Sequence, residues 1–230
     1  MNLFFQPAVS EGVNHLTADE SYHAFRVLRM SPGDDIQITD GKGVFFQATI
    51  TSIDSKKCGF KINTEKKIPK KNYHIHIAIA PTKNADRIEW FVEKAVEIGV
   101  DEISFILCKN SERKVLNLER IEKIAISAMK QSQQACMPIL HPLQPFNDIL
   151  KQSADQKFIG HVDSSNPVHL KAIAKPNKSY LVLIGPEGDF SNEELNTALQ
   201  AGFEKVSLGE NRLRTETAGL TACQTLQFVN

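Results

Sequence analysis

The feature that most constrains the fold is a regular alternation of strand-like and helix-like segments that runs from residue 73 to the end of the chain. Residues 74–80 alternate isoleucine with other residues and stop at Pro81, a pattern typical of a strand. Residues 86–98 place apolar side chains on one helical face and meet Gly99, which favours a helix end. This order predicts an α/β domain with a parallel sheet and helices on both faces. Further strands are predicted at 103–107, 157–162, 180–184 and 205–208, and further helices at 118–134, 191–201 and 215–229.

The first seventy residues follow a different pattern, in which short strands are joined by tight turns. Residues 18–28 have the spacing of a helix, and residues 35–39 and 44–53 are predicted strands connected by a glycine-rich hairpin sequence. These elements indicate a small β-barrel or sandwich with one helix. A lysine-rich stretch at 66–72 separates the two patterns. The predicted domains are therefore residues 1–70 and residues 73–230.

Composition excludes several classes of protein. Of the 230 residues, 41% are hydrophobic and 23% are charged, which is typical of a folded globular chain. No apolar run approaches the roughly 20 residues that span a bilayer, and the first residues lack the pattern of a signal peptide. We therefore expect a cytoplasmic protein with no membrane partner, whose four separated cysteines are reduced thiols. The histidines show no ligand-like spacing, so no metal site is predicted.

The formal net charge is zero, so the overall charge does not by itself indicate a nucleic-acid partner. Seven lysines nevertheless lie between Lys56 and Lys71, opposed in that stretch only by Glu65. Two interpretations stay open for this run. It is either a solvated face or linker, or a patch that follows a phosphate backbone.

Two segments interrupt the regular pattern, and each stands at the carboxyl end of a predicted strand, where open parallel sheets bind their ligands. The first is Gly185-Pro186-Glu187-Gly188-Asp189-Phe190, in which glycine and proline allow backbone groups to approach a ligand closely. Ser191 and Glu194 then form a capping-box sequence that sets the start of the next helix. A tight structural turn is the alternative interpretation.

The second segment follows a strand that ends at Gly209. It brings Arg212 and Arg214 to the start of a helix, and basic side chains beside a cleft are suited to a phosphate or a carboxylate. Glu216 suits the positive end of that helix dipole. An ordinary surface loop with ion pairs is the alternative. Neither segment matches a dinucleotide-binding or Walker loop.

Taken together, the two segments are specific. The pattern G-P-E-G-x-F-S-x-x-E after an apolar strand, followed by L-G-x-x-x-L-R-T-E-T-A, resembles the SPOUT methyltransferases. More closely, it is similar to the bacterial family that methylates N3 of a uridine in small-subunit (16S) ribosomal RNA. The resemblance covers nearly the whole chain. It includes the motifs His23-x-x-x-Val27-Leu28-Arg29, Glu93-Lys94-Ala95-x-Glu97-Ile98-Gly99, Ser111-Glu112-Arg113 and Gln131-Ser132.

This resemblance implies more than the spacing shows. It implies an amino-terminal PUA-like β-barrel that binds RNA and a carboxyl-terminal α/β domain threaded as a trefoil knot, an exception to the rule against knots. It also implies that the domain binds S-adenosyl-L-methionine and forms a homodimer that acts on small-subunit ribosomal RNA, naked or within the 30S particle. The implied cofactor residues are His161, Ile184, Gly185, Glu187, Gly188, Leu208, Gly209, Leu213, Arg214 and Thr217.

The resemblance also suggests roles for charged residues. Arg214 is the candidate for stabilising negative charge on the uracil imide, and Glu216 is a candidate base or a partner that organises Arg214. Candidate contacts to the RNA backbone are Arg26, Arg29, Lys56 and Lys57. The chain departs from the family pattern at a few positions. Asp189 replaces a second glycine, Asn211 replaces a basic residue, and Gln133-Gln134 replaces Gly-Arg.

Two other functions compete with uridine-N3 methylation. One is a ribose 2′-O RNA methyltransferase of the same superfamily, which would share the cofactor loops. The other is an RNA-binding assembly factor that has lost catalysis. The intact glycine-rich and Arg-Thr-Glu-Thr loops favour an enzyme, since a pure binding module would not need them.

Overall fold

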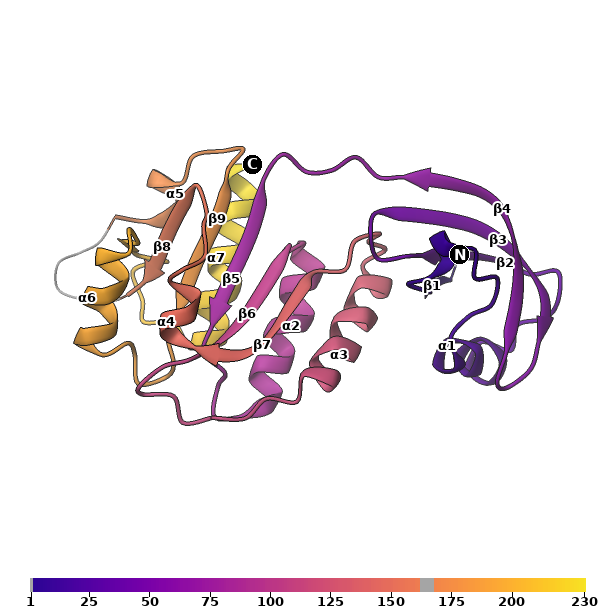
Figure 1. Ribbon diagram of the computed structural model, residues 1–230, viewed down its shortest axis with the longest axis horizontal. Coiled ribbons are helices and arrows are strands. Elements are labelled where there is room, and N and C mark those ends of the chain that lie inside the picture. The colour runs from indigo at the N-terminus through magenta and orange to yellow at the C-terminus, as the bar shows by residue number, and fades with distance from the viewer. Residues whose placement is uncertain (1, 162–167) are drawn as a thin grey trace. The chain divides into compact units, whose positions relative to one another are not determined.

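The computed structural model describes residues 2–161 and 168–230, which form two compact units (Figure 1). One unit comprises residues 1–70 together with 126–137. The other comprises residues 71–125 and 138–230. The division therefore falls within the long helix α3 (Leu118–Gln131), and each unit has its own core.

The first unit is built on a four-stranded sheet in the order β1-β2-β3-β4. A parallel pair, β1 with β2, precedes two antiparallel pairs. Buried side chains such as Phe4, Ile36, Ile38 and Ile50 form its core. The strands are β1 (Leu3–Phe5), β2 (Asp35–Thr39), β3 (Val44–Ile53) and β4 (Cys58–Lys67).

The lysine run is mostly a strand. β4 lies at the edge of the sheet, and its residues from Lys61 onward are exposed. Exposed lysines on an edge strand oppose pairing with another chain, so this part of the run is a solvated face. The sequence pattern left β4 unassigned because its charged residues mask the alternation of a strand.

The helix of the first unit changes its winding partway. α1 (Ala18–Tyr22) starts at Thr17, whose Oγ1 accepts a hydrogen bond from the Glu20 amide at 3.3 Å. The chain then continues as a π-helical turn (His23–Val27), a rare form that is frequent at functional sites. The segment 126–137 packs into the same unit, because Lys130 Nζ lies 2.6 Å from Glu20 Oε1 and Thr39 Oγ1 donates to the Ala135 carbonyl at 2.9 Å.

The second unit confirms the α/β prediction. Its six strands are all parallel and lie in the order β10-β8-β9-β5-β6-β7. The strands are β5 (His74–Ile79), β6 (Glu102–Leu107), β7 (Ile139–Pro145), β8 (Gln156–Gly160), β9 (Ser179–Ile184) and β10 (Glu204–Val206). The helices are α2 (Ala85–Ile98), α4 (Phe146–Ile149), α5 (Leu170–Ile173), α6 (Asn192–Gln200) and α7 (Thr215–Val229).

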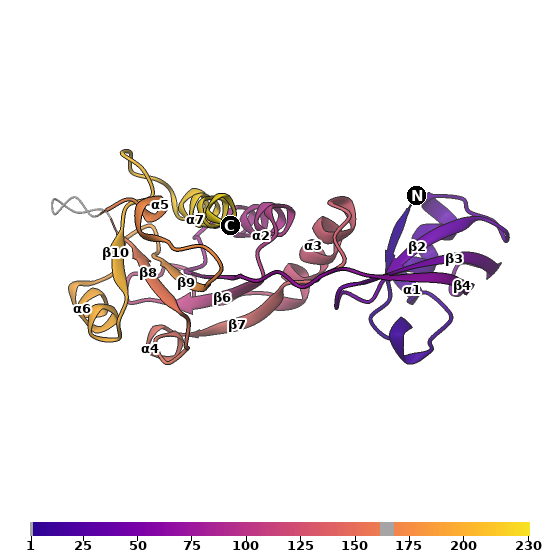
Figure 2. The same cartoon turned by 90° about the horizontal axis from the view of Figure 1, so that it is seen from above.

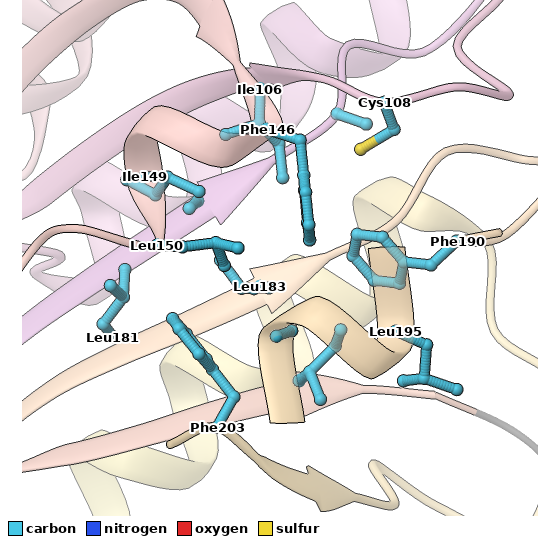
Figure 3. Packing of buried hydrophobic residues seen from close by; sticks show 14 residues of the cluster. Ile106, Cys108, Phe146, Ile149, Leu150, Leu181, Leu183, Phe190, Leu195 and Phe203 are labelled. Atoms are coloured by element: carbon cyan, nitrogen blue, oxygen red, sulfur yellow. The ribbon is translucent and has the colours of Figure 1, made fainter. Parts of the chain in front are cut away.

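Helices cover both faces of this sheet (Figure 2). α2 and α7 lie together on one face, where a Cβ on Gly219 would come within 2.6 Å of the Phe91 ring, so the glycine permits the close approach. α4 and α6 lie on the other face, where their apolar side chains pack with Leu181 and Leu183 of β9 (Figure 3). This packing buries the strands β5, β6 and β9 on both sides, as expected for a parallel sheet.

One predicted strand is shorter in the structure than the sequence pattern indicates. The strand predicted at 157–162 ends at Gly160 in β8, and residue 162 lies outside the described residues. The trefoil knot stays a prediction.

All four cysteines are free thiols, and burial raises the pKa of Cys58 to about 11 and that of Cys223 to about 12. Within the described ranges, no helix has the length and apolar character required to cross a membrane.

Candidate active site

A cavity of about 470 Å³ opens at the carboxyl ends of β8, β9 and β10. The strand order explains its position. β8 lies between β9 and β10, with Gly160 in register with both Ile184 and Val206, so the segments after three strands meet at one place. The lining residues are Gly160, His161, Ile184, Gly185, Pro186, Glu187, Asp189, Val206, Leu208, Gly209, Asn211, Arg212, Leu213, Arg214, Thr215 and Ala218.

The segment after β9 packs against an aromatic ring. A Cβ on Gly185 would lie 3.0 Å from the Phe190 ring, so a larger residue would push the turn away from it. Phe190 is itself buried against Phe146 of α4, with ring centroids 5.6 Å apart (Figure 3). In addition, Thr215 Oγ1 donates a hydrogen bond to the Gly185 carbonyl at 3.0 Å, which ties the two cavity segments together.

A second loop, residues 108–113, braces the same segment from the β6 side. Asn110 Nδ2 donates to the carbonyls of Gly188 and Asp189 at 3.2 and 3.0 Å. Arg113 donates from Nε to the Thr82 carbonyl at 2.9 Å and from Nη2 to the Lys83 carbonyl at 2.6 Å.

The Lys83 amide completes this brace by donating to Glu187 Oε1 at 2.9 Å. These bonds give a structural reason for the Ser111-Glu112-Arg113 motif, which the sequence did not connect with the cavity.

The segment after β10 depends on a glycine. Gly209 has φ of +148°, a conformation that side-chain-bearing residues rarely adopt. Ser207 Oγ holds this turn by donating to the Gly209 carbonyl at 2.9 Å and accepting from its amide at 3.2 Å. The chain then reaches α7, whose first residue Thr215 lines the cavity, so the positive end of that helix faces it.

Eight of the ten residues proposed to bind the cofactor line this cavity. Gly188 and Thr217 are not among the lining residues. A Cβ on Gly188 would lie 3.1 Å from Cβ of Asn110, so this glycine faces the bracing loop. Thr217 lies in the first turn of α7, where its carbonyl accepts a bond from Thr221 Oγ1. The lining residues that sequence reasoning did not select are Gly160, Pro186, Asp189, Val206, Asn211, Arg212, Thr215 and Ala218.

The two candidate catalytic residues are placed differently. Arg214 is exposed and lines the cavity, and its side chain makes no capping bond to α7. Glu216 is buried and outside the lining, and its Oε1 lies 3.9 Å from Arg87 Nε of α2. Within the described residues, neither Glu216 Oε2 nor Glu187 Oε2 has a hydrogen-bond partner.

The four candidate RNA contacts all lie in the first unit and are exposed. Arg26 lies in the π-helical turn, and Arg29 follows it with φ of +54°. Lys56 and Lys57 occupy the turn between β3 and β4, where Asp54 Oδ1 accepts bonds from both of their amides at 2.7 and 2.9 Å. These bonds lower the pKa of Asp54.

The lysine turn is also fixed to α1. Ser21 Oγ accepts a bond from the Cys58 amide at 2.9 Å, so the turn and the helix are neighbours. The fold therefore groups these cations within one unit.

The opposite, amino-terminal edge of the parallel sheet carries a cluster of ionisable side chains. Glu102 of β6 lies 2.9 Å from His74 Nε2 and 2.6 Å from His141 Nε2, and His76 Nδ1 lies 3.6 Å away. Burial lowers the pKa of His76 to about 4. The histidine contacts, acting against burial, lower the pKa of Glu102 to about 2, and the hydrogen bond to Glu102 raises that of His74.

Comparisons with known proteins agree with the two-unit fold and with the cavity at the carboxyl edge of the sheet. A family model described as an RNA methyltransferase domain matches residues 69–227, and one described as an RNA methyltransferase PUA domain matches residues 16–63. The fold and the cavity thus define an RNA methyltransferase with a PUA domain.

Comparison with individual relatives identifies the family within this class of RNA methyltransferases. The ribosomal RNA small subunit methyltransferase E of Buchnera aphidicola is 34% identical over 225 residues, which cover 93% of this chain and 87% of that protein. The structure of a probable rRNA-methyltransferase from Porphyromonas gingivalis is 44% identical, covers 100% of this chain and 98% of its own, and has a TM-score of 0.93. A ribosomal RNA small subunit methyltransferase E from Neisseria gonorrhoeae, bound to S-adenosyl methionine, is 26% identical, covers 100% and 98%, and has a TM-score of 0.88. The chain belongs to the ribosomal RNA small subunit methyltransferase E family.

Proposed function

We propose that this protein transfers a methyl group from S-adenosyl-L-methionine to N3 of a specific uridine in small-subunit (16S) ribosomal RNA. The observation that carries the proposal is that the segments after β9 and β10, which share the family's motifs, line one cavity. Membership of the family supports the reaction class. A cytoplasmic location follows from this substrate.

The cavity fits the cofactor in size and chemistry. Its volume of about 470 Å³ lies within the usual range of small-molecule sites. Ile184, Val206, Leu208 and Leu213 supply apolar walls, while backbone groups and Glu187 supply polar ones. We assign cofactor contacts to His161, Ile184, Gly185, Glu187, Leu208, Gly209, Leu213 and Arg214, whereas Gly188 packs against Asn110 of the bracing loop and Thr217 lies in the first turn of α7. When bound, S-adenosyl-L-methionine supplies an activated methyl group on its sulfonium.

The chain's own task is to make uridine N3 reactive and to align it. N3 carries an imide proton and becomes a good nucleophile only when that proton leaves, which places negative charge on the uracil. The Arg214 guanidinium at the cavity and the positive end of α7 are placed to stabilise that charge. Because Glu216 faces Arg87 rather than the lining, we assign it to positioning the start of α7.

The first unit is proposed to hold the RNA. Arg26, Arg29, Lys56 and Lys57 offer four exposed cations, and Tyr22 beside them is 55% exposed. Replacing Arg29 with alanine should weaken RNA binding and make its salt dependence shallower by roughly one phosphate contact. Fluorescence anisotropy over a salt series measures both effects. An unchanged slope would remove Arg29 from the interface.

A homodimer is the proposed assembly. Trp90 of α2 is 45% exposed and Phe228 of α7 is 77% exposed, and these two helices pack together on one face of the sheet. A second copy covering this face would bury both rings, which large exposed apolar side chains favour. Light scattering of the purified protein tests the mass, and Phe228→Asp should shift it toward a monomer.

The decisive experiment is methylation with labelled S-adenosyl-L-methionine, using RNA and 30S subunits from a strain that lacks the enzyme. We expect N3-methyluridine at a single position in 16S RNA, identified by mass spectrometry of nucleosides. A ribose-methylated nucleoside would instead indicate a 2′-O methyltransferase. Absence of cofactor binding by calorimetry would indicate a non-catalytic assembly factor. Comparing naked RNA with 30S subunits identifies the substrate form.

A further inference from the structure

Asp189 holds an unusual backbone conformation in the cavity wall. Its φ is +61°, in the left-handed region that favours glycine. Aspartate tolerates this region better than most residues because its short side chain can bond locally, and here the Phe190 amide donates to Asp189 Oδ1 at 2.7 Å. A strained residue that persists in a cavity wall is a candidate for a functional role.

The second oxygen of Asp189 contacts a different loop. Oδ2 lies 3.1 Å from Nδ1 of His161, which is the distance of an ion pair when the imidazole is protonated. The His161 side chain is only 14% exposed, whereas that of Asp189 is 39% exposed. The contact therefore places a mostly buried imidazole against a carboxylate.

The two residues of this contact belong to two different segments of the cavity wall. His161 follows β8 and Asp189 follows β9, and both line the cavity. His161 also donates its amide to the Val206 carbonyl of β10 at 3.3 Å. On the other side, the Asp189 carbonyl is held by Asn110. The side-chain contact thus links the ends of adjacent strands across the cavity wall.

We propose that Asp189 is a positioning residue that acts through His161, holding the imidazole in the cavity wall and so setting the affinity for the cofactor. This inference rests on the proposed function, because it assumes that the cavity takes S-adenosyl-L-methionine. Asp189 contributes through its carboxylate, and its backbone conformation is the cost of placing that carboxylate there.

Two substitutions distinguish the effect of the Asp189 carboxylate from the effect of its backbone conformation. Asp189→Gly removes the carboxylate and relieves the strained φ, whereas Asp189→Ala removes the carboxylate and keeps the strain. We expect both variants to bind S-adenosylhomocysteine about three- to tenfold more weakly by calorimetry. Only Asp189→Ala should also lower the melting temperature. In turnover assays Asp189→Gly should raise KM for S-adenosyl-L-methionine and leave kcat unchanged.

A double-mutant cycle tests whether Asp189 acts through His161. In the background of His161→Ala, Asp189→Gly should cause no further loss of affinity. Asn177→Gly is the matched control, because Asn177 also has positive φ, +59°, but does not line the cavity. It should leave the affinity unchanged.

Two results would overturn the proposal: wild-type affinity in Asp189→Gly, or an undiminished effect of that change in the His161→Ala background. Failure of the wild-type protein to bind S-adenosyl-L-methionine or S-adenosylhomocysteine would instead overturn the proposed function, so the two failures are distinguishable.

Discussion

The two edges of the parallel sheet differ in how their carboxylate side chains are satisfied. At the amino edge, both carboxylate oxygens of Glu102 contact histidines of the neighbouring strands β5 and β7. At the carboxyl edge, Gly209 and Asp189 hold positive φ, and one carboxylate oxygen each of Glu187 and Glu216 has no hydrogen-bond partner in the described part of the chain. Unsatisfied polar groups are costly, so their presence at the carboxyl edge marks the edge where a ligand is bound.

This difference indicates that the amino edge of the sheet contributes to stability and that the carboxyl edge contributes to function. At the amino edge, histidines of β5 and β7 satisfy the Glu102 carboxylate, and the strand backbone is held in an extended conformation. Loops after the strands are free of that constraint and can hold backbone groups open to a ligand. Substitutions at the two edges should therefore change different quantities.

The largest effect is expected from Arg214→Ala at the carboxyl edge. Removing a group that stabilises developing charge commonly costs about 10²- to 10³-fold in rate, and we expect a loss of that order in kcat. Cofactor affinity should change little by comparison, and the melting temperature should hold, because Arg214 makes no capping bond to α7. Single-turnover methylation combined with calorimetry checks both. Wild-type turnover would remove Arg214 from the mechanism.

At the amino edge the expected effect is on stability and depends on pH. The pKa of folded His76 is lowered to about 4 from an ordinary 6.5, so between these values the unfolded chain binds the proton more strongly. The free energy of unfolding should therefore fall as the pH is lowered from 6.5 to 4, by about 2–3 kcal/mol from this residue. His74, whose pKa is raised, adds stability below pH 6.5 that is lost only at higher pH, so it does not produce this slope.

His76→Gln tests this assignment, since glutamine can still bond Ser104 but does not titrate. Urea unfolding between pH 4 and 6.5 should show a shallower pH dependence, while methylation at neutral pH stays at the wild-type rate. A large loss of turnover in folded His76→Gln would contradict the separation of the two edges.

Gly209→Val should weaken cofactor binding by about tenfold to a hundredfold. Valine is strained at the glycine's φ of +148°, so the turn after β10 must shift. A Cβ at this position would meet no protein atom within 4 Å, so the damage should be confined to this turn. Calorimetry with S-adenosylhomocysteine measures the loss, with Gly202→Val, also at positive φ but outside the cavity, as control. Normal binding by Gly209→Val would refute the placement of the cofactor.

The smallest effect is expected from Arg113→Lys in the bracing loop. Lysine cannot reproduce the two guanidinium bonds to the Thr82 and Lys83 carbonyls, so Glu187 should be held less firmly. We expect KM for S-adenosyl-L-methionine to rise about two- to fivefold with kcat unchanged. Lys114→Ala, at the exposed neighbouring position, should leave both parameters unchanged.

Several elements of the fold follow directly from local sequence. α7 spans the predicted residues, and the Ser191–Glu194 capping box forms as expected. β7 was not predicted because its prolines, Pro142 and Pro145, break the strand pattern. The four-residue helix α4 is too short to show a periodic signal.

The two departures from family glycines also become understandable. Asp189 and Gln133 both have positive φ, so each replaces glycine at a position where glycine is favoured. The sequence showed these residues, but it could not show that both of them adopt a positive φ.

By itself, the sequence determined the alternation of strands and helices, the two loops at strand ends and the family to which the chain belongs, because these depend on residues close together along the chain. Only the tertiary structure decided that β8 lies between β9 and β10, that Asn110 and Arg113 brace the cavity, and that Glu216 faces Arg87. The physical reason is that strand order and loop contacts are set by packing between segments far apart in the chain. No local pattern records that packing.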